Sequence, residues 1–285
     1  MRYALIGMVV AVAMVACQFD TSGVASGPDA SGSSPTDAAV PPQEIRLASA
    51  NLRCLLDDWD ARVQALAAEL AAYRPSMVAL QEVCRDDSRD GLAELQGMLE
   101  ALTGTTYVAV RTDTHLAWDR YQEGIAVLVD QAIADATIVE LPAGLFQRRA
   151  VVVRVPGLLL ASTHLSFGDQ QNARRAQMDT LLQAMSDIRG ADETMVIAGD
   201  FNETPDGLVL TSALVAGFQD AWSTLHPADP GPTFPSAAPD VRIDFVLVAP
   251  GAAGLRPVSA ERFLDTPTAG IMPSDHLGLQ VVLAR

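Results

Sequence analysis

The sequence predicts an α/β domain in which two packed β-sheets are flanked by helices. Three observations support this fold class. Many short apolar runs are typical of buried strands, amphipathic segments typical of helices are interspersed among them, and polar residues directly follow several of the runs. The order is neither a pure alternation of strands and helices nor an all-β pattern. Two packed sheets with helices outside therefore fit the order of elements best.

The first part of the domain predicts alternating strands and helices. Asp57 or Asp58 can cap a helix whose apolar residues recur at a spacing near 3.6, and Pro75 follows its end. Apolar runs before and after this helix predict strands. The expected order is strand, helix, strand and helix, over residues 45–50, 59–73, 77–81 and 91–102.

The second part of the domain is richer in strands. Successive apolar runs predict strands at 106–110, 124–129, 133–140, 150–155 and 158–163. A long helix, a strand and a short helix are expected next, at 169–188, 195–198 and 207–214. A proline-rich loop then precedes two final strands, with the loop at 227–239 and the strands at 242–248 and 277–283.

The amino-acid composition excludes several classes of reaction and of partner. The chain has 285 residues, of which 49% are hydrophobic, and this is enough for a sizeable core. All 19 basic residues are arginine, which excludes chemistry that needs a phosphate-loop lysine or a Schiff-base lysine. The net charge of −16 argues against bulk electrostatic binding to nucleic acid. A local basic groove is left open, although solvated arginines are the simpler interpretation of Arg148, Arg149, Arg154, Arg174 and Arg175.

The N-terminus has the pattern of a targeting segment. Met1 and Arg2 give a positive start, and the apolar stretch 4–16 is too short for a transmembrane helix. It leads into Met-Val-Ala-Cys, ending at Cys17, which resembles the cleavage box of bacterial lipoproteins. The resemblance implies a signal peptide at 1–16 and a lipid anchor on Cys17. An ordinary signal peptide cut nearby is the alternative.

The predicted anchor sets the expected location. Gln18 rather than Asp follows the cysteine, and by resemblance to the sorting rule of diderm bacteria this favours the outer membrane over the inner one. Residues 17–43 are rich in small and polar residues without periodicity, so a disordered linker is expected behind the lipidated cysteine. We therefore expect an extracytoplasmic, lipid-anchored protein of a bacterial cell envelope, with its globular domain at 44–285.

Cys54 and Cys84 remain as a pair once Cys17 is assigned to the anchor. Each follows a polar strand end by two or three residues. If the two strands are neighbours, the cysteines lie on adjacent loops at the same sheet edge. An oxidising compartment permits them to pair. We predict a Cys54–Cys84 disulfide that braces the candidate site, with two free buried thiols as the alternative.

Several strand-like runs end or begin at a polar residue. The most informative case is Gly199-Asp200-Phe201-Asn202, because an acid and an amide two residues apart after a strand point the same way and can hold a phosphoryl group and a water. Any one of these polar residues fits a capped turn. Ligands of α/β sheets collect at strand ends, so the whole set indicates one site, formed by Asn51, Glu82, His164, Asp200, Asp244 and Asp275-His276.

In this order the polar set resembles the endonuclease/exonuclease/phosphatase superfamily. The resemblance covers nearly all of residues 44–285. It is specific for the superfamily and weak for the substrate, and it implies a four-layer α/β sandwich of two mixed β-sheets flanked by helices. The segments that carry it are Asn51, Gln81-Glu82, Thr163-His164, Gly199-Asp200-Phe201-Asn202, Arg242-Ile243-Asp244 and Ser274-Asp275-His276.

The resemblance implies a divalent-metal site. Glu82 matches the main metal ligand of the family, assisted by Asn51 and Asp275. Carboxylate and amide oxygens suit a hard cation. Mg²⁺ or Mn²⁺ is therefore the expected cofactor.

The resemblance also implies a catalytic set. His276 matches a histidine held by a buried aspartate, here Asp244, and His164 matches a second active-site histidine. Fixing an imidazole in this way prepares a general base or a phosphate-binding imidazolium. Asp200 and Asn202 match the pair that positions the attacking water and a phosphate oxygen.

Tyr121-Gln122-Glu123 resembles the deoxyribonuclease branch of the family, in which a Glu shortly after a Tyr orients the second histidine. Glu123 is therefore expected to orient His164, and Tyr121 to touch the phosphate. A solvated acid at a strand edge is the alternative for Glu123. Since the chain has no lysine, an arginine must take any phosphate-binding role that a lysine has in other branches.

The expected function is that of an extracytoplasmic, metal-dependent phosphodiesterase, which hydrolyses P–O bonds by in-line attack of water. The expected partners are a phosphodiester substrate, either nucleic acid or a phospholipid head group, and the membrane that the lipid anchor reaches. The acidic charge disfavours long duplex DNA, and no long apolar hairpin supports a membrane-inserting sphingomyelinase. A monomer is expected. The alternatives are a phosphomonoesterase of the same superfamily and a catalytically silent surface-binding lipoprotein.

Overall fold

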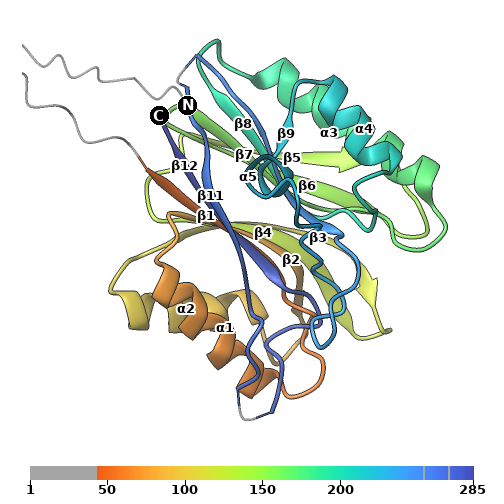
Figure 1. Cartoon of the computed structure of the whole chain (residues 1–285). Helices are drawn as coiled ribbons and strands as arrows, with labels where there is room; N and C mark the ends of the chain where they lie inside the picture. The colour runs from red at the N-terminus through yellow and green to blue at the C-terminus, as the bar shows by residue number, and fades with distance from the viewer. Residues whose placement is uncertain (1–43, 253, 269) are drawn as a thin grey trace, which may run out of the picture. The chain divides into compact units, whose positions relative to one another are not determined.

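Two six-stranded mixed β-sheets pack face to face in the computed structural model, which describes residues 44–252, 254–268 and 270–285 (Figure 1). In spatial order the first sheet contains β11 (Arg256–Phe263), β12 (Gly278–Ala284), β1 (Ile45–Asn51), β2 (Met77–Arg85), β4 (Tyr121–Val129) and β3 (Val108–Ala117). The second contains β5 (Asp135–Leu141), β6 (Arg148–Val155), β7 (Leu158–His164), β8 (Thr194–Asp200), β10 (Asp244–Ala249) and β9 (Gln219–Asp220).

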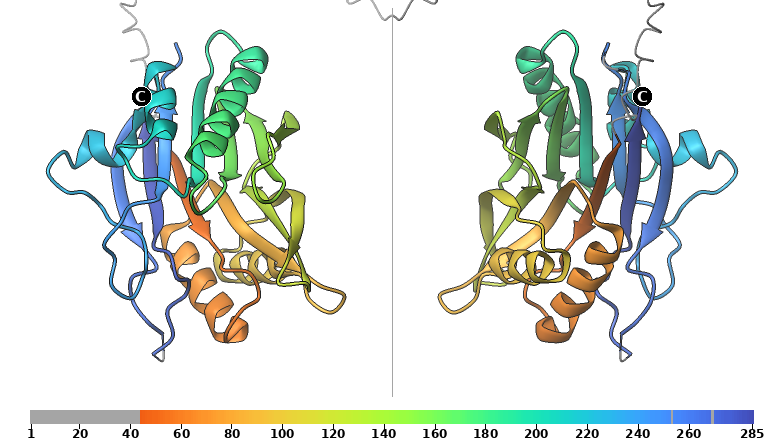
Figure 2. Two further views of the ribbon diagram at one scale, coloured as in Figure 1. Left: turned by 90° about the vertical axis from the view of Figure 1, so that its right-hand side faces the viewer. Right: turned by 90° about the vertical axis from the view of Figure 1, so that its left-hand side faces the viewer.

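Helices cover the outer face of each sheet. The first sheet carries α1 (Trp59–Tyr73) and α2 (Gly91–Thr103), and the second carries α3 (Gln171–Ile188) and α4 (Leu208–Val215). The short α5 (Ala221–Leu225) lies against β10 and β11, one strand from each sheet. Figure 2 shows α1 and α3 at opposite ends of the molecule with strands between them. These layers form the predicted four-layer α/β sandwich.

The central core lies between the two sheets. It is built from the inward faces of their strands, for example Leu47 and Val127 in the first sheet and Leu160 and Val246 in the second, each at most 1% exposed. Side chains alternate across a strand, so the neighbours of these residues face the helices instead. Burial of each such side chain contributes about 1.5–3 kcal/mol, which makes this core the main force that joins the sheets.

Two outer cores join the helices to the sheets. On the first sheet, Leu66 and Leu70 of α1 pack with the outward-facing Leu80 of β2. The α1 helix begins after Asp58, whose side chain accepts the N–H of Ala61 at 3.3 Å, so Asp58 rather than Asp57 is the cap. On the second sheet, apolar residues of α3 at helical spacing have the same role, namely Met178, Leu181 and Met185.

The sequence pattern does not predict β9, α5 or β11. Strand β11 lies at a sheet edge, contains Pro257 and alternates with charged residues such as Glu261, so it lacks an apolar run. Strand β9 has two residues and α5 has five, which is too short for a periodic signal. Strand β3 continues beyond its predicted end to Ala117. Every residue of this strand before Ala117 is at least partly exposed, so the extension carries no apolar pattern.

The predicted signal peptide, the lipidated Cys17 and the linker to residue 43 lie outside the described residues. The globular part begins with β1 at Ile45. Across residues 44–252, 254–268 and 270–285, no helix is long and apolar enough to cross a membrane.

The carboxyl ends of four central strands meet at one edge of the sandwich. Strands β1 and β2 are parallel neighbours in the first sheet, and β7 and β8 are parallel neighbours in the second. Their ends therefore bring Asn51, Glu82, His164 and Asp200 to the same side. Within the second sheet, His164 lies directly opposite Asp200 in the register of the two strands.

Gly199 allows β8 to approach β7 closely. Its φ is 151°, and a Cβ atom at this position would lie 1.9 Å from the carbonyl oxygen of Thr163. Only a residue without a side chain fits. The glycine before Asp200 is thus required by backbone packing, and this packing places the acid across from His164.

Candidate active site

The side-chain amide of Asn51 links the two sheets at the strand ends. The Nδ2 of Asn51 donates to Oε1 of Glu82 at 3.0 Å and to Oδ2 of Asp200 at 3.3 Å. Asn51 and Asp200 are each 1% exposed, so the hydrogen bond between them forms where water does not compete. The Oδ1 of Asn51 accepts the backbone N–H of Arg53, which fixes the amide orientation. Asn51 therefore fixes the distance between the carboxylate of Glu82 in the first sheet and that of Asp200 in the second.

Glu82 lies in a β-bulge of β2, between Leu80 and Val83, and has a φ of 49°. A positive φ is uncommon for a residue with a long side chain and persists where the surrounding structure imposes it. The backbone carbonyl of Glu82 accepts the N–H of Cys54 at 3.1 Å. Burial raises the pKa of the Glu82 carboxyl. A bound cation would offset the cost of keeping this carboxylate ionised.

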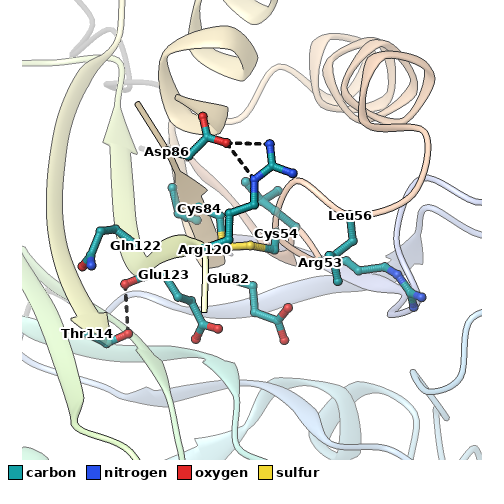
Figure 3. The surroundings of a disulfide bond; sticks show 12 residues. Arg53, Cys54, Leu56, Glu82, Cys84, Asp86, Thr114, Arg120, Gln122 and Glu123 are labelled. Carbon is teal, nitrogen blue, oxygen red and sulfur yellow. Dashed lines mark hydrogen bonds and ion pairs between the residues drawn. A yellow bond between two sulfur atoms is a disulfide. The ribbon is translucent and has the colours of Figure 1, made fainter. Parts of the chain in front are cut away.

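The predicted disulfide is present between Cys54 and Cys84, with their Cα atoms 4.7 Å apart. It ties the loop after β1 to the end of β2, and both residues are 1% exposed. Figure 3 shows the carboxylates of Glu82 and Glu123 pointing the same way, on one side of this bond. The disulfide therefore braces the segment that carries Glu82, and the alternative of two free thiols is wrong.

His164 is enclosed by a buried acid and a buried arginine. Its Nδ1 lies 3.5 Å from Oε1 of Glu123 and 3.3 Å from Nη1 of Arg148, and the same Nη1 donates to Glu123 at 3.2 Å. Burial alone would raise the pKa of Glu123, but the hydrogen bond and charge of His164 and the charge of Arg148 outweigh it and lower this pKa. Glu123 is thus an ionised carboxylate in contact with the ring nitrogen that it is expected to orient.

Asp200 and Asn202 point to the same side, as their spacing predicts. The backbone N–H of Asn202 donates to Oδ1 of Asp200 at 2.8 Å, and Asn202 has a φ of 52°, which asparagine tolerates better than most residues. The Nδ2 of Asn202 lies 3.0 Å from Nε2 of His164 and donates to the carbonyl of Leu165 at 3.2 Å. Between the two, Phe201 is fully buried in the core. The turn therefore directs Phe201 into the core and Asp200 and Asn202 into the site.

His276 is held from behind by Asp244. The Nδ1 of His276 lies 3.0 Å from Oδ2 of Asp244, and its Nε2 lies 3.8 Å from Oδ2 of Asp200. Burial lowers the pKa of the His276 imidazole, but the negative charges of Asp244 and Asp200 outweigh it and raise this pKa to about 10. The ring is therefore protonated at neutral pH. This favours a phosphate-binding imidazolium over a general base for His276.

These side chains surround a cavity of about 520 Å³. Asn51 and Asp244 lie behind its wall and hold the residues that form it. The predicted site residues that line the cavity come from both sheets and comprise Glu82, Glu123, His164, Asp200, Asn202 and His276.

Besides Asn51 and Asp244, two predicted catalytic or metal-binding residues do not line this cavity. Tyr121 is 8% exposed and packs in the apolar cluster beneath α1 and α2, with the guanidinium of Arg120 4.7 Å from its ring centre. Asp275 instead forms an ion pair with Arg53, at 2.5 Å between Nη1 and Oδ2. The structure therefore brings together most of the predicted set but leaves the side chains of these two residues outside the cavity.

Two further lining residues, Arg148 and His115, are not among the predicted catalytic or metal-binding residues. Arg148 is 2% exposed, so its interpretation as a solvated arginine is wrong, and it begins β6 opposite Leu141 of β5. His115 comes from the bulge of β3, with its Nε2 3.8 Å from Oε2 of Glu123, and burial lowers its pKa. Three of the four histidines in the chain line this one cavity, so the rarity of histidine is a usable signal.

The donor atoms fit a divalent cation. Glu82, His164 and Asp200 each offer one atom within 4.8 Å of the other two. Asn51 contacts both carboxylates through Nδ2, an N–H donor, while its Oδ1 accepts the N–H of Arg53, so the amide orders the two carboxylates. Two carboxylate oxygens suit a hard cation such as Mg²⁺ or Mn²⁺. The residues at the strand ends are thus able to hold the metal that the sequence predicts.

Solved structures share this fold at low sequence identity. An endonuclease/exonuclease/phosphatase family protein from Leptotrichia buccalis C-1013-b aligns with a TM-score of 0.68 at 17% identity, over 83% of this chain and 98% of that one. TDP2 from D. rerio, complexed with a single-strand DNA product, gives 0.68 at 21% identity, over 84% and 98%. The human Nocturnin catalytic domain with bound sulfate gives 0.67 at 23% identity, over 85% and 93%.

The sequence itself carries the family signal. No curated protein matches the chain. The profile of the Endonuclease/Exonuclease/phosphatase family, however, matches residues 48–276, from β1 to the histidine that Asp244 holds. Because this match spans most of the chain and the fold agrees with it, the chain belongs to the endonuclease/exonuclease/phosphatase family.

Proposed function

We propose that this protein is an extracytoplasmic, metal-dependent phosphodiesterase that hydrolyses P–O bonds by in-line attack of water. Membership of a family of phosphoester hydrolases supports the reaction class. The observation that carries the proposal is the position of Asp200. Its Oδ2 atom lies 3.3 Å from the amide of Asn51, 3.4 Å from His164 and 3.8 Å from His276. One buried carboxylate thus faces the amide that binds Glu82 and both histidines.

Glu82 would hold Mg²⁺ or Mn²⁺, and Asn51 and Asp275 would assist it, as the family resemblance implies. The raised pKa of Glu82 supports this role, because burial makes the ionised carboxylate costly and a bound cation would offset that cost. A bound divalent ion would neutralise negative charge on the phosphate oxygens.

The roles of the remaining residues follow from their contacts. Asp200 positions the attacking water and accepts its proton, since it is the acid that both rings face. The P–O bond opposite the water breaks, and the leaving alkoxide would be protonated or neutralised by a bound metal. His276 is a protonated donor to a phosphate oxygen. Asn202 holds a second phosphate oxygen, and Glu123 fixes the ring of His164.

Arg148 takes the place of a phosphate-binding lysine. It is the buried arginine that lines the cavity, and its Nε has no hydrogen-bond partner among the described residues. A permanently charged donor is suited to a phosphate oxygen. A contact of Tyr121 with the phosphate stays a prediction.

The proposed substrate is a nucleic acid strand or a phospholipid head group. The TDP2 neighbour is complexed with a single-strand DNA product, and this supports a nucleic-acid substrate here. The net charge of −16 favours a short or single-stranded one over long duplex DNA.

We place the protein outside the cytoplasm, as a monomer anchored in a bacterial envelope, in the outer membrane, through a lipid on Cys17. The lipoprotein-like sequence before Cys17 supports the anchor. The disulfide supports an oxidising compartment. Metabolic labelling with a fatty acid, compared between the wild type and Cys17→Ala, tests the anchor. An unlabelled wild-type protein would overturn it.

A substrate panel tests the proposed reaction. The full-length protein is assayed on plasmid DNA, single-stranded DNA, RNA, sphingomyelin, an aryl phosphodiester and an aryl phosphomonoester, with Mg²⁺ and with EDTA. We expect hydrolysis of at least one diester that EDTA and His276→Ala both abolish. Hydrolysis that persists in EDTA contradicts the proposal. Turnover of the monoester alone favours the phosphomonoesterase, and no turnover favours a binding protein.

A further inference from the structure

Exposed apolar side chains gather at one side of the cavity. Leu116 near the end of β3 is 49% exposed, Trp118 in the β3–β4 turn is 56% exposed, and Phe167 in the loop after β7 is 44% exposed. All three line the cavity that contains Asp200 and His276. Large exposed apolar side chains beside a polar cavity indicate a binding surface.

Three rings in this wall form a stack. The rings of His115 and Phe146 lie 4.3 Å apart with planes 15° apart, and those of Phe146 and Phe167 lie 5.9 Å apart with planes 27° apart. They come from β3, the loop before β6 and the loop after β7, so three separate segments build one stack. The outermost ring, Phe167, is the most exposed. A further flat ring can continue this stack.

Trp118 adds a second aromatic surface to the same cavity. It lies at the tip of the β3–β4 hairpin with a φ of 49°, next to Asp119 with a φ of 52°. A bulky residue in the left-handed region carries strain, and here its indole is more than half exposed instead of packed in a core. The hairpin thus presents an indole to the cavity at an energetic cost.

The aromatic wall is joined to the proposed phosphate site. The same cavity is lined by Trp118 and Phe167 and by Glu82, His164 and Asp200. Its volume of about 520 Å³ is in the range of small-molecule sites and holds a phosphate group with one ring system. An ester group attached to a phosphate among the carboxylates and histidines would therefore reach the aromatic side chains.

We propose that this wall is a subsite for a flat aromatic ring carried by the substrate, a nucleobase or an aryl ester. The inference rests on the proposed function and names the group that the substrate carries next to its phosphate. The adjoining groove is lined by Asp86, Asp87 and Asp119 together with Arg85 and Arg120, so it has no excess of positive charge to attract an anionic lipid surface. The parallel rings favour a π-surface over an alkyl chain.

Binding of matched phosphonates tests the subsite without turnover. Phenylphosphonate, cyclohexylphosphonate and methylphosphonate are titrated calorimetrically into the full-length protein with Mg²⁺. We expect phenylphosphonate to bind about tenfold more tightly than the other two, since stacking distinguishes a flat ring from a saturated one. Adenosine 5′-monophosphate against ribose 5-phosphate asks whether a nucleobase gains the same advantage as a phenyl ring.

Variants assign the preference to the wall. Phe167→Leu and Trp118→Leu keep an apolar side chain but remove the ring, and each should reduce the phenyl preference while leaving methylphosphonate binding unchanged. Val215→Ala, at an 85% exposed position on α4 outside this cavity, is the control and should keep the full preference.

Three outcomes would overturn the subsite. One is equal binding of the phenyl and cyclohexyl compounds, and another is a preference that survives both ring-removing variants. The third is binding to phosphatidylcholine vesicles that Trp118→Asp abolishes, without any phenyl preference, which would assign the wall to a membrane surface. The proposed function fails on a different result. A phenyl preference without hydrolysis of any phosphodiester would support the subsite and contradict the phosphodiesterase. Hydrolysis of a phosphodiester without the phenyl preference would support the phosphodiesterase and contradict the subsite.

Discussion

Asp200 is the side chain on which the polar contacts converge. It is 1% exposed, and its two oxygens contact the amide of Asn51, the backbone N–H of Asn202 and both histidines. A buried carboxylate with so many partners is positioned to a fraction of an ångström. We therefore attribute the proposed role of Asp200 as proton acceptor to its negative charge rather than to the shape of its side chain.

Replacement of this charge is the first prediction. Asp200→Asn keeps the size and most hydrogen bonds but cannot accept a proton, so kcat on an aryl phosphodiester should fall by about 10²–10⁴-fold. The matched control is Asp179→Asn on the half-exposed surface of α3, which should leave kcat unchanged. Steady-state kinetics and a circular dichroism melt of each variant provide the comparison. Near-normal kcat in Asp200→Asn would remove Asp200 from the mechanism.

The charge of His276 gives a prediction about pH. Its raised pKa of about 10 reflects the carboxylates of Asp244, Asp200 and Asp275 around it. A group whose folded pKa is above its unfolded value near 6.5 stabilises the protein below that pH, and this contribution is lost as the pH rises through about 10. NMR of the metal-free protein should show an imidazolium at pH 8. A ring that titrates near 6.5 would contradict this.

The elements around the site differ in how far the sequence predicts them. Runs such as Met195–Ala198 are buried on both faces and give a continuous apolar signal. Edge pieces such as β11 and the two-residue β9 give none, because solvent on one side permits charged residues. Residues at strand ends were predictable, since their position depends on the strands. Burial of Arg148 and Tyr121 depends on contacts between segments far apart in the chain, which local patterns do not contain.

The disulfide supports a prediction at the scale of two elements. It closes a separation of 30 residues between the loop after β1 and the end of β2. Cys54→Ser with Cys84→Ser should reduce the free energy of unfolding by roughly 2–4 kcal/mol. It should also weaken Mg²⁺ binding, because the bulge of β2 that carries Glu82 loses its brace. Denaturant melts and Mg²⁺ titration measure the two effects, and unchanged Mg²⁺ affinity would limit the disulfide to a structural role.

At the scale of the whole molecule, the site joins the two sheets. Glu82 and Asn51 come from the first sheet, and His164 and Asp200 come from the second. A cation held there binds the folded protein and not the separated sheets, so it stabilises the fold by linkage.

Removal of the metal should therefore lower the free energy of unfolding. At a Mg²⁺ concentration about 100 times its Kd, the free energy of unfolding should rise by about 2.7 kcal/mol, and EDTA should reverse it. Glu82→Gln should remove this dependence, whereas the exposed Glu261→Gln should keep it. Thermal melts with and without Mg²⁺ decide between these results. A Mg²⁺-dependent shift that persists in Glu82→Gln would place the cation elsewhere.

The most direct test of the central claim is hydrolysis of bis(4-nitrophenyl) phosphate by the full-length protein with Mg²⁺, with EDTA, and in Glu82→Gln. The account predicts turnover with Mg²⁺ that EDTA abolishes and Mg²⁺ restores, and a loss of about 10²–10³-fold in Glu82→Gln, with Glu261→Gln equal to the wild type. Equal turnover in Mg²⁺ and EDTA, or in Glu82→Gln and the wild type, would contradict a metal-dependent phosphodiesterase built on these strand ends.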